Sequence, residues 1–250
     1  NLIGETQSAS HIVPVSRNTF GLNVEAPAVI RIDESSDSIM PYARNLQNKE
    51  LCVSGEYIVR YIYNDELLKD CDGTNFKKRV FAEKKKEVGK GHFVSGKSLP
   101  AELFSSYKPG FYEIELFAED TLHEDGKMKI DTVSAKIELA LFSSRKSSFN
   151  ASRDFFYSSS DKFSASAPAD IYFKSKYGDI YVYWFAVSEK GLVEHGCERL
   201  KNKIKHFRYD YKPEYGDGIS LSLFYVKDGE VHYFNKKIEK ERQNKDLTLR

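Results

Sequence analysis

An acidic stretch is the chain's clearest candidate for metal chemistry. Asp70-Cys-Asp-Gly-Thr-Asn75 places side-chain oxygens at alternating positions, as the start of a calcium-binding loop does. Such a loop needs Gly at position 6 and a bidentate Glu at position 12. Here the glycine is at the fourth position, and Phe81 occupies the twelfth. An acidic hairpin turn is therefore the better interpretation.

The histidines and cysteines do not assemble into a metal motif. No two histidines stand four residues apart, and no second ligand pair completes the one close pair, His195 and Cys197. We expect structural roles for all six histidines: His11, His92, His123, His195, His206 and His232. The chain has three cysteines, an odd number, and we expect them to be small, partly buried thiols. A disulfide between Cys52 and Cys71 is the alternative.

Motifs for nucleophilic or nucleotide chemistry are missing. The chain has no Gly-x-Ser-x-Gly elbow, no phosphate-binding glycine loop with lysine and no dinucleotide fingerprint. Lys84-Lys-Lys86 lies between Glu83 and Glu87, which is typical of a self-neutralised strand edge. Asn150-Ala-Ser152 is a glycosylation sequon of a kind that arises often by chance. We assign no catalytic, cofactor-binding or metal-binding residue and expect no cofactor.

Composition indicates a soluble β-rich chain of one large or two ordinary domains. The 250 residues include 16 Tyr and 17 Phe but one Trp, and such aromatic residues suit pleated, half-buried surfaces. A formal net charge of +1 offers no field to attract nucleic acid or an anionic membrane. No apolar run is long enough to cross a bilayer, and no signal peptide opens the sequence. We expect a fragment or processed chain whose address signal lies elsewhere.

The elements that would position any site are strands, and the clearest is a hairpin within Tyr215 to Ile238. Two alternating runs flank Asp228-Gly229, which fits a two-residue type I′ turn. This turn predicts that Leu223 faces Phe234 and that Ile219 faces Ile238. One face of the hairpin is then apolar and the other mostly polar, so a second layer must cover the apolar face.

Similar alternating runs recur along both halves. Residues 56–63 predict a central strand, and residues 111–119 show the cleanest period of two in the first half. Residues 127–142 predict a long strand with a bulge near Thr132, where the apolar positions change parity. We expect at most a short helix in residues 35–48 and a glycine-rich loop over residues 89–100.

Turn signals every eight to twelve residues favour two sequential β-sandwiches. We predict an all-β fold of two tandem antiparallel sandwiches, comprising a tail (residues 1–15), sandwich 1 (16–147) and sandwich 2 (148–250).

One strand is apolar on both faces. Asp179 to Val187 alternates Tyr181, Tyr183 and Phe185 with Val182, Trp184 and Ala186, which indicates the middle of a sheet. If its own domain leaves the Tyr181 side uncovered, that side is a patch for a neighbouring domain or a ligand. We favour packing in a core or between domains over a platform on which glycans stack.

Several stretches resemble macroglobulin-like domains of the alpha-2-macroglobulin family, specifically of large bacterial, Bacteroides-type members. The resemblance rests on four stretches: Gly91-His-Phe-Val-Ser-Gly-Lys-Ser-Leu-Pro100, Lys108-Pro-Gly-Phe-Tyr-Glu-Ile-Glu-Leu116, residues 215–231 and Asp246-Leu-Thr-Leu249. It implies sandwich domains of immunoglobulin- or fibronectin-like architecture that act as scaffold in a long protease-entrapping chain. The family's Cys-Gly-Glu-Gln thioester is absent, so no functional residue carries over.

From this resemblance we expect a non-enzymatic structural part of an endopeptidase inhibitor. Its partners would be neighbouring domains of the same chain and, through the full-length protein, proteases. The expected location is the cell envelope, either periplasmic or surface-exposed, with the full-length chain a candidate lipoprotein. The alternative is a cell-surface adhesin or a module that binds glycans or proteins. Exposed aromatic residues and ligand binding by this chain would favour that alternative.

Overall fold

The computed structural model describes residues 17–33, 38–70, 77–99, 101–124, 127–145, 151–163 and 168–241. Within these ranges nearly all regular structure is strand, and the only helical segments are the 3-10 turns η1 (Ala101–Phe104) and η2 (Pro213–Tyr215). Neither turn could cross a bilayer, and no described helix is long and apolar enough to do so. The predicted all-β class is confirmed.

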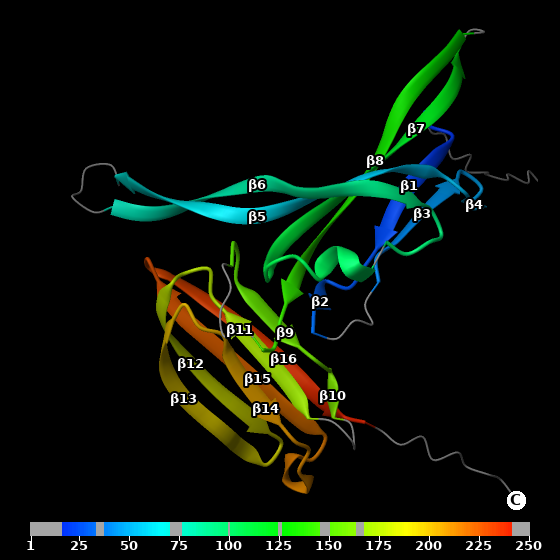
Figure 1. Cartoon of the computed structure of the whole chain (residues 1–250). Helices are drawn as coiled ribbons and strands as arrows, with labels where there is room; N and C mark the ends of the chain where they lie inside the picture. The colour runs from blue at the N-terminus through cyan, green and yellow to red at the C-terminus, as the bar shows by residue number, and fades with distance from the viewer. Residues whose placement is uncertain are drawn as a thin grey trace, which may run out of the picture.

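Residues 20–142 form two sheets that enclose one core (Figure 1). The three-stranded sheet has the order β1-β3-β4, and the five-stranded sheet has the order β2-β8-β7-β5-β6. Their strands are β1 (Phe20–Glu25), β2 (Val29–Arg31), β3 (Met40–Asn45), β4 (Glu50–Leu51), β5 (Ser54–Asp70), β6 (Lys77–Val94), β7 (Gly110–Glu124) and β8 (Lys127–Phe142). Val59, Ile114 and Leu116 are fully buried between the sheets.

Residues 155–240 form a second pair of sheets around a second core. The orders are β14-β11-β9 and β10-β16-β15-β12-β13. The strands are β9 (Phe155–Ser158), β10 (Lys162–Phe163), β11 (Ala169–Lys174), β12 (Asp179–Ser188), β13 (Gly191–Lys201), β14 (Lys205–Tyr209), β15 (Gly218–Lys227) and β16 (Glu230–Lys240). Two short pairings, β2 with β8 and β10 with β16, are parallel, so the sandwiches are not wholly antiparallel as expected.

We call these two units sandwich 1 and sandwich 2. The predicted division near residue 148 falls in residues 146–150, which lie outside the described part of the chain. The predicted tail, residues 1–15, lies outside it as well.

The β15–β16 hairpin has the register that its turn residues predict. Leu223 pairs with Phe234 and Ile219 with Ile238. Asp228 and Gly229 have φ of 51° and 80°, as a type I′ turn requires. The apolar face is covered by sandwich 2, where Leu223 is fully buried.

Three local predictions were wrong. Residues 40–45 are strand β3, because their alternate side chains enter the core of sandwich 1. Strand β8 pairs with β7 without a register shift, so there is no bulge near Thr132. The parity change has another cause: Met128 and Ile130 are 68% and 57% exposed, in a stretch of hairpin that extends past the core.

The first part of the predicted glycine-rich loop is strand, since β6 continues to Val94, whereas residues 95–99 form a turn and irregular chain as expected. Gly91 allows the close approach of Tyr57, whose hydroxyl would lie 2.6 Å from a Cβ at that position. Gly89 does the same for the Tyr107 hydroxyl, at 2.0 Å. The glycines thus admit two tyrosine rings against a continuous strand.

The β5–β6 hairpin is much longer than the sheet that it belongs to. β5 has 17 residues, but its pairing with β7 covers only Glu56 to Ile62. The remainder, from Tyr63 onward, pairs with β6 alone and reaches over sandwich 2 (Figure 1). We call this two-stranded extension the arm.

Candidate functional site

The outer face of the β10-β16-β15-β12-β13 sheet carries a group of uncovered aromatic side chains. Tyr181, Tyr183 and Phe185 on β12 are 54%, 42% and 38% exposed, and Tyr233 on β16 is 59% exposed. Their alternate neighbours on β12, such as Val182, are buried in the core. The favoured packing of this face in a core or between the two sandwiches is therefore wrong, because the face is open to solvent.

The strand register orders this outer face in rows. Tyr183 lies beside Phe224, which pairs with Tyr233, and the rings of Tyr183 and Phe224 stack with centroids 5.3 Å apart. The next row toward the hairpin turn contains Val226 and Val231, both more than half exposed. In the opposite direction the face becomes polar. Together these side chains make an apolar patch of the kind that marks contact with a partner.

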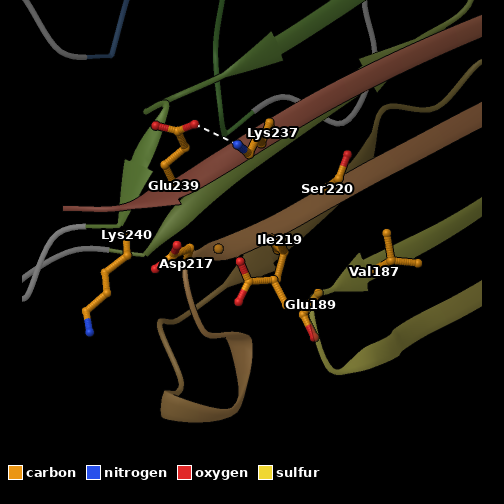
Figure 2. A pocket seen from close by; sticks show the side chains of 10 residues that line it. Val187, Glu189, Asp217, Ile219, Ser220, Lys237, Glu239 and Lys240 are labelled. Carbon is orange, nitrogen blue, oxygen red and sulfur yellow. Dashed lines mark hydrogen bonds and ion pairs between the residues drawn. The ribbon is translucent and has the colours of Figure 1, made fainter. Parts of the chain in front are cut away.

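The polar end of this face opens into a shallow hollow of about 270 Å³ (Figure 2). Val187 and Ile219 are its apolar lining residues, and Ser220 and several charged side chains complete the lining. Lys237 and Glu239 are ion-paired at 2.8 Å, which leaves the rim largely self-neutralised. Such a hollow offers packing and hydrogen bonds but no arrangement of a nucleophile and a base.

The second feature of note is an apolar joint between the sandwiches. Ala140 and Phe142 at the end of β8 are buried against Phe155 of β9 and Tyr172 of β11. The Phe142 ring lies 4.7 Å from the Tyr172 ring and 5.2 Å from the Phe155 ring, centroid to centroid. Because side chains of both sandwiches meet in this cluster, the two sandwiches share a small core of their own.

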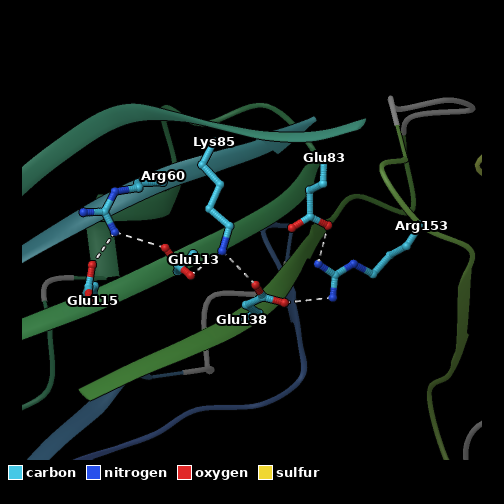
Figure 3. A network of polar contacts seen from close by, with 7 residues as sticks. All are labelled: Arg60, Glu83, Lys85, Glu113, Glu115, Glu138 and Arg153. Carbon is cyan, nitrogen blue, oxygen red and sulfur yellow. Dashed lines mark hydrogen bonds and ion pairs between the residues drawn. The ribbon is translucent and has the colours of Figure 1, made fainter. Parts of the chain in front are cut away.

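A chain of alternating charges extends the joint across sandwich 1 (Figure 3). Arg153 in the link donates to Glu138 of β8 at 2.8 Å and to Glu83 of β6 at 3.0 Å. Lys85 bridges Glu138 and Glu113, and Arg60 continues the series from Glu113 to Glu115. The Arg153 guanidinium also lies over the Phe111 ring, 5.4 Å from its centroid. One arginine thereby ties the link to three strands of sandwich 1.

Burial and hydrogen bonding act in opposite directions on these carboxylates. Burial favours the neutral form of Glu113, but hydrogen bonds from Lys85 and Arg60 outweigh it and lower the Glu113 pKa. The same balance, with hydrogen bonds from Arg153 and Lys85, lowers the pKa of Glu138. Both groups are therefore stabilised as anions that hold the joint, not as proton donors.

The other residues that the sequence analysis named lie at different places in the fold and form no common site among the described residues. His195 and Cys197 share the outer face on β13, opposite Phe185 and Tyr183. His206 contacts Asp170 at 2.7 Å, and His232 lies 3.5 Å from Asp154. Lys84 and Lys85 are neutralised by Asp65, Glu113 and Glu138, and not by the adjacent Glu83 and Glu87.

Some sequence candidates cannot be placed. Residues 71–76 of the calcium-like stretch, His11 and Asn150 lie outside the described residues. In the part that the structure does describe, no group of three or more His, Cys, Asp or Glu side chains could hold a metal ion. Cys52 and Cys197 are exposed free thiols, so the expected partial burial is wrong for these two. The alternative Cys52–Cys71 bridge is not supported, because Cys52 is free, and Cys71 lies outside the described residues.

Sequence reasoning missed Arg153 and the arm. The role of Arg153 depends on carboxylates 15 and 70 residues away in the sequence. The local sequence offers one signal, a basic residue two positions before an aromatic one, Arg153 and Phe155.

The fold and its surfaces define a pair of β-sandwiches joined by a packed link, with an aromatic outer face. No protein-family model matches the chain, and no curated protein matches it. Among solved structures, it is similar to the native form of the alpha-2-macroglobulin of Escherichia coli, at 11% identity and a TM-score of 0.32. That similarity covers 87% of this chain and 14% of that one.

Two further structures show similarity at the same low level. The elastase-activated form of the same bacterial protein has 10% identity and a TM-score of 0.27, over 89% of this chain and 23% of that one. Murine CEACAM1b has 11% identity and a TM-score of 0.24, over 88% of this chain and all of that one. The chain thus spans 14% and 23% of the two macroglobulin chains. Scores of this size assign no family, and a Bacteroides-type relative stays a prediction.

Proposed function

We propose that this chain is a non-enzymatic scaffold that holds two β-sandwiches at a fixed angle within a longer, macroglobulin-like protein. The joint carries this proposal, because a linker that only connects domains needs no buried rings and no ion-paired arginine. Phe142 and Phe155 are both buried there, and Arg153 bonds two strands of sandwich 1. The carboxylates of Glu113 and Glu138 are held as anions by hydrogen bonds in the charge network at this joint, which supports a structural role over catalysis.

The parent protein, on this proposal, inhibits endopeptidases in the cell envelope, periplasmic or surface-exposed, and this part contacts neighbouring domains of the same chain. The support is the resemblance of residues 91–100, 108–116 and 215–231 to macroglobulin-like domains. A test is to incubate the full-length protein with an endopeptidase and a protein substrate. Cleavage that continues undiminished would refute the inhibitor role without touching the scaffold role.

The fixed angle is testable with thiols that the chain already has. Cys52 in sandwich 1 and Cys197 in sandwich 2 are both exposed, so spin labels attached there report the distance between the sandwiches. The chain with Cys71→Ser should give one narrow distance distribution in an electron–electron double-resonance experiment. Phe142→Ser should broaden it, because a buried ring is lost from the joint. A broad distribution in the parent chain would contradict a scaffold role.

A second candidate function is binding of a glycan or protein by the outer face of sandwich 2, as a surface adhesin does. The exposed Tyr181, Tyr183 and Tyr233 favour it, since aromatic residues are enriched at binding surfaces. Tyr183→Ser and Tyr233→Ser should then abolish binding on a glycan array while leaving the melting temperature unchanged. A parent chain that binds no glycan and no purified envelope protein would remove this candidate.

A further inference from the structure

A second hollow, of about 460 Å³, lies between the arm and sandwich 2. Tyr63 and Phe81 of the arm form one side of it, and Lys174, Lys176 and Asn202 form the other. The Phe81 ring lies 5.2 Å from that of Tyr177 in sandwich 2, which closes one end of the space. This volume falls within the range of ordinary small-molecule sites, so the chemistry of its lining determines what it can bind.

The most buried charged group in the lining is a lysine that forms no ion pair with a described residue. Lys174, the last residue of β11, is 2% exposed, and its Nζ donates to the Ser175 carbonyl at 2.8 Å. Among the described residues, no carboxylate lies within ion-pair distance of this amine. An ammonium group has three donors, so a buried one with a single protein acceptor is poorly satisfied.

Two further observations at the same hollow indicate a ligand. Lys176 also lacks a described carboxylate partner, and its Nζ lies over the rings of Phe81 and Tyr177, 5.7 and 5.3 Å from their centroids. The Ser152 hydroxyl, in a residue 6% exposed, has no hydrogen-bond partner. Glu66 is the one carboxylate that lines the hollow among the described residues. Two amines and one acid leave the lining with a net positive charge.

We propose that this hollow binds a small molecule bearing an oxyanion, which is held by Lys174 and Lys176 while its body packs against Tyr63 and Phe81. The oxyanion supplies the acceptors that the buried amine lacks. The aromatic walls suit a flat or ring-shaped body such as a sugar acid. This proposal does not depend on the scaffold function, but a bound ligand would contact both the arm and sandwich 2.

Titration of the amine gives the site a characteristic pH dependence. Burial lowers the pKa of Lys174 to about 8, against the smaller opposing effect of Asp154. The amine is therefore mostly cationic at pH 7 and mostly neutral at pH 9.5. Affinity for an oxyanion should fall several-fold between these two values.

The test is isothermal titration calorimetry on the whole 250-residue chain, in chloride buffer at constant ionic strength. The probes are sodium sulfate, sodium glucuronate and, as the neutral control, glucose. We expect both anions to bind at pH 7 and glucose not to bind. Tighter binding of glucuronate than of sulfate would identify a sugar acid, and equal binding would identify the oxyanion alone as the ligand.

Matched variants make the result decisive. Lys174→Met should weaken anion binding at least tenfold, and Lys190→Met, which removes the same charge from an exposed turn of sandwich 2, should leave it unchanged. The emission of the single tryptophan, buried in sandwich 2, verifies that each variant is folded. Absence of binding by the parent chain, or equal binding by a folded Lys174→Met variant, would overturn the proposal.

Discussion

Replacing Lys174 by Met should stabilise sandwich 2 at neutral pH, although it removes a hydrogen bond. The Lys174 amine is buried among the residues that begin sandwich 2, and it is held as a cation against the cost of desolvation. Met has a similar length, no charge and the flexibility to fill an irregular space. The variant therefore keeps the packing and loses the buried charge.

The magnitude follows from the pKa. Burial lowers the Lys174 pKa from an ordinary 10.5 to about 8. At about 1.4 kcal/mol per pH unit, this corresponds to roughly 3 kcal/mol of destabilisation while the amine is charged. Loss of the hydrogen bond to the Ser175 carbonyl destabilises the variant by about 1 kcal/mol and offsets part of this gain. We expect a net gain of about 2 kcal/mol at pH 7.

The sign of the pH dependence is fixed by linkage. Between pH 8 and 10.5 the unfolded chain binds more protons at this lysine than the folded chain does, so the parent gains stability as the pH rises. The Lys174→Met variant has no such gain. The difference between them should therefore be largest below pH 8 and should shrink toward pH 10.

Urea unfolding followed by Trp184 fluorescence measures this difference. Trp184 is the only tryptophan and lies in the core of sandwich 2, so its emission reports on that unit. Lys190→Met, at an exposed turn, is the control for a change of net charge. A Lys174→Met variant that is less stable than the parent at pH 7, or a difference that stays constant up to pH 10, would refute this reasoning.

Three other changes have clear expected outcomes. Arg153→Ala should destabilise the joint by about 1 kcal/mol, since its ion pairs are partly exposed. The loss should fade as the pH falls below 4.5 and Glu138 of β8, whose pKa is lowered, takes up a proton; a loss that does not change across an acid titration of the unfolding free energy would argue against ion pairing. Leu223→Asp should unfold sandwich 2 by burying an unpaired charge, whereas Ser220→Asp on the outer face should be tolerated; equal melting of the two would contradict the assigned faces. Gly91→Ala should cost about 1–3 kcal/mol in thermal unfolding, because its methyl group would overlap a tyrosine hydroxyl 2.6 Å away, and an unchanged melting temperature would show that the ring can move aside.

The strands were predictable because their alternation is local. Asp228-Gly229 fixed the register of ten residue pairs, since its turn type allows only one alignment. The period of two likewise placed Val182, Trp184 and Ala186 together on one face of β12, and the structure shows that this face is the buried one. Local patterns failed at residues 89–91, where glycine indicated a loop, because the tyrosine hydroxyls that require glycine come from Tyr107 and Tyr57, far away in the sequence.

The joint could not be predicted, because it depends on distances across the fold. Sequence contains Glu83, Glu138 and Arg153, but only the pairing of β5, β6, β7 and β8 brings them to one face. The exposure of Tyr181 and Tyr183 is similar, since the sequence pattern cannot say whether a second layer covers a face. Residue types predicted what each face offers, and the topology decided which faces meet.

The arm explains why the two sandwiches are held together at more than one point. An isolated two-stranded hairpin is marginally stable in water, and from Tyr63 onward β5 has no partner but β6 among the described strands. Sandwich 2 supplies the missing layer: Phe81 packs on its core beside Tyr177, and Asn64 donates to the Ser152 carbonyl in the link. Order in the arm and the angle between the sandwiches should therefore be lost together, because each depends on the same contacts. The hollow with Lys174 lies within these contacts, so an anion bound there would stabilise both.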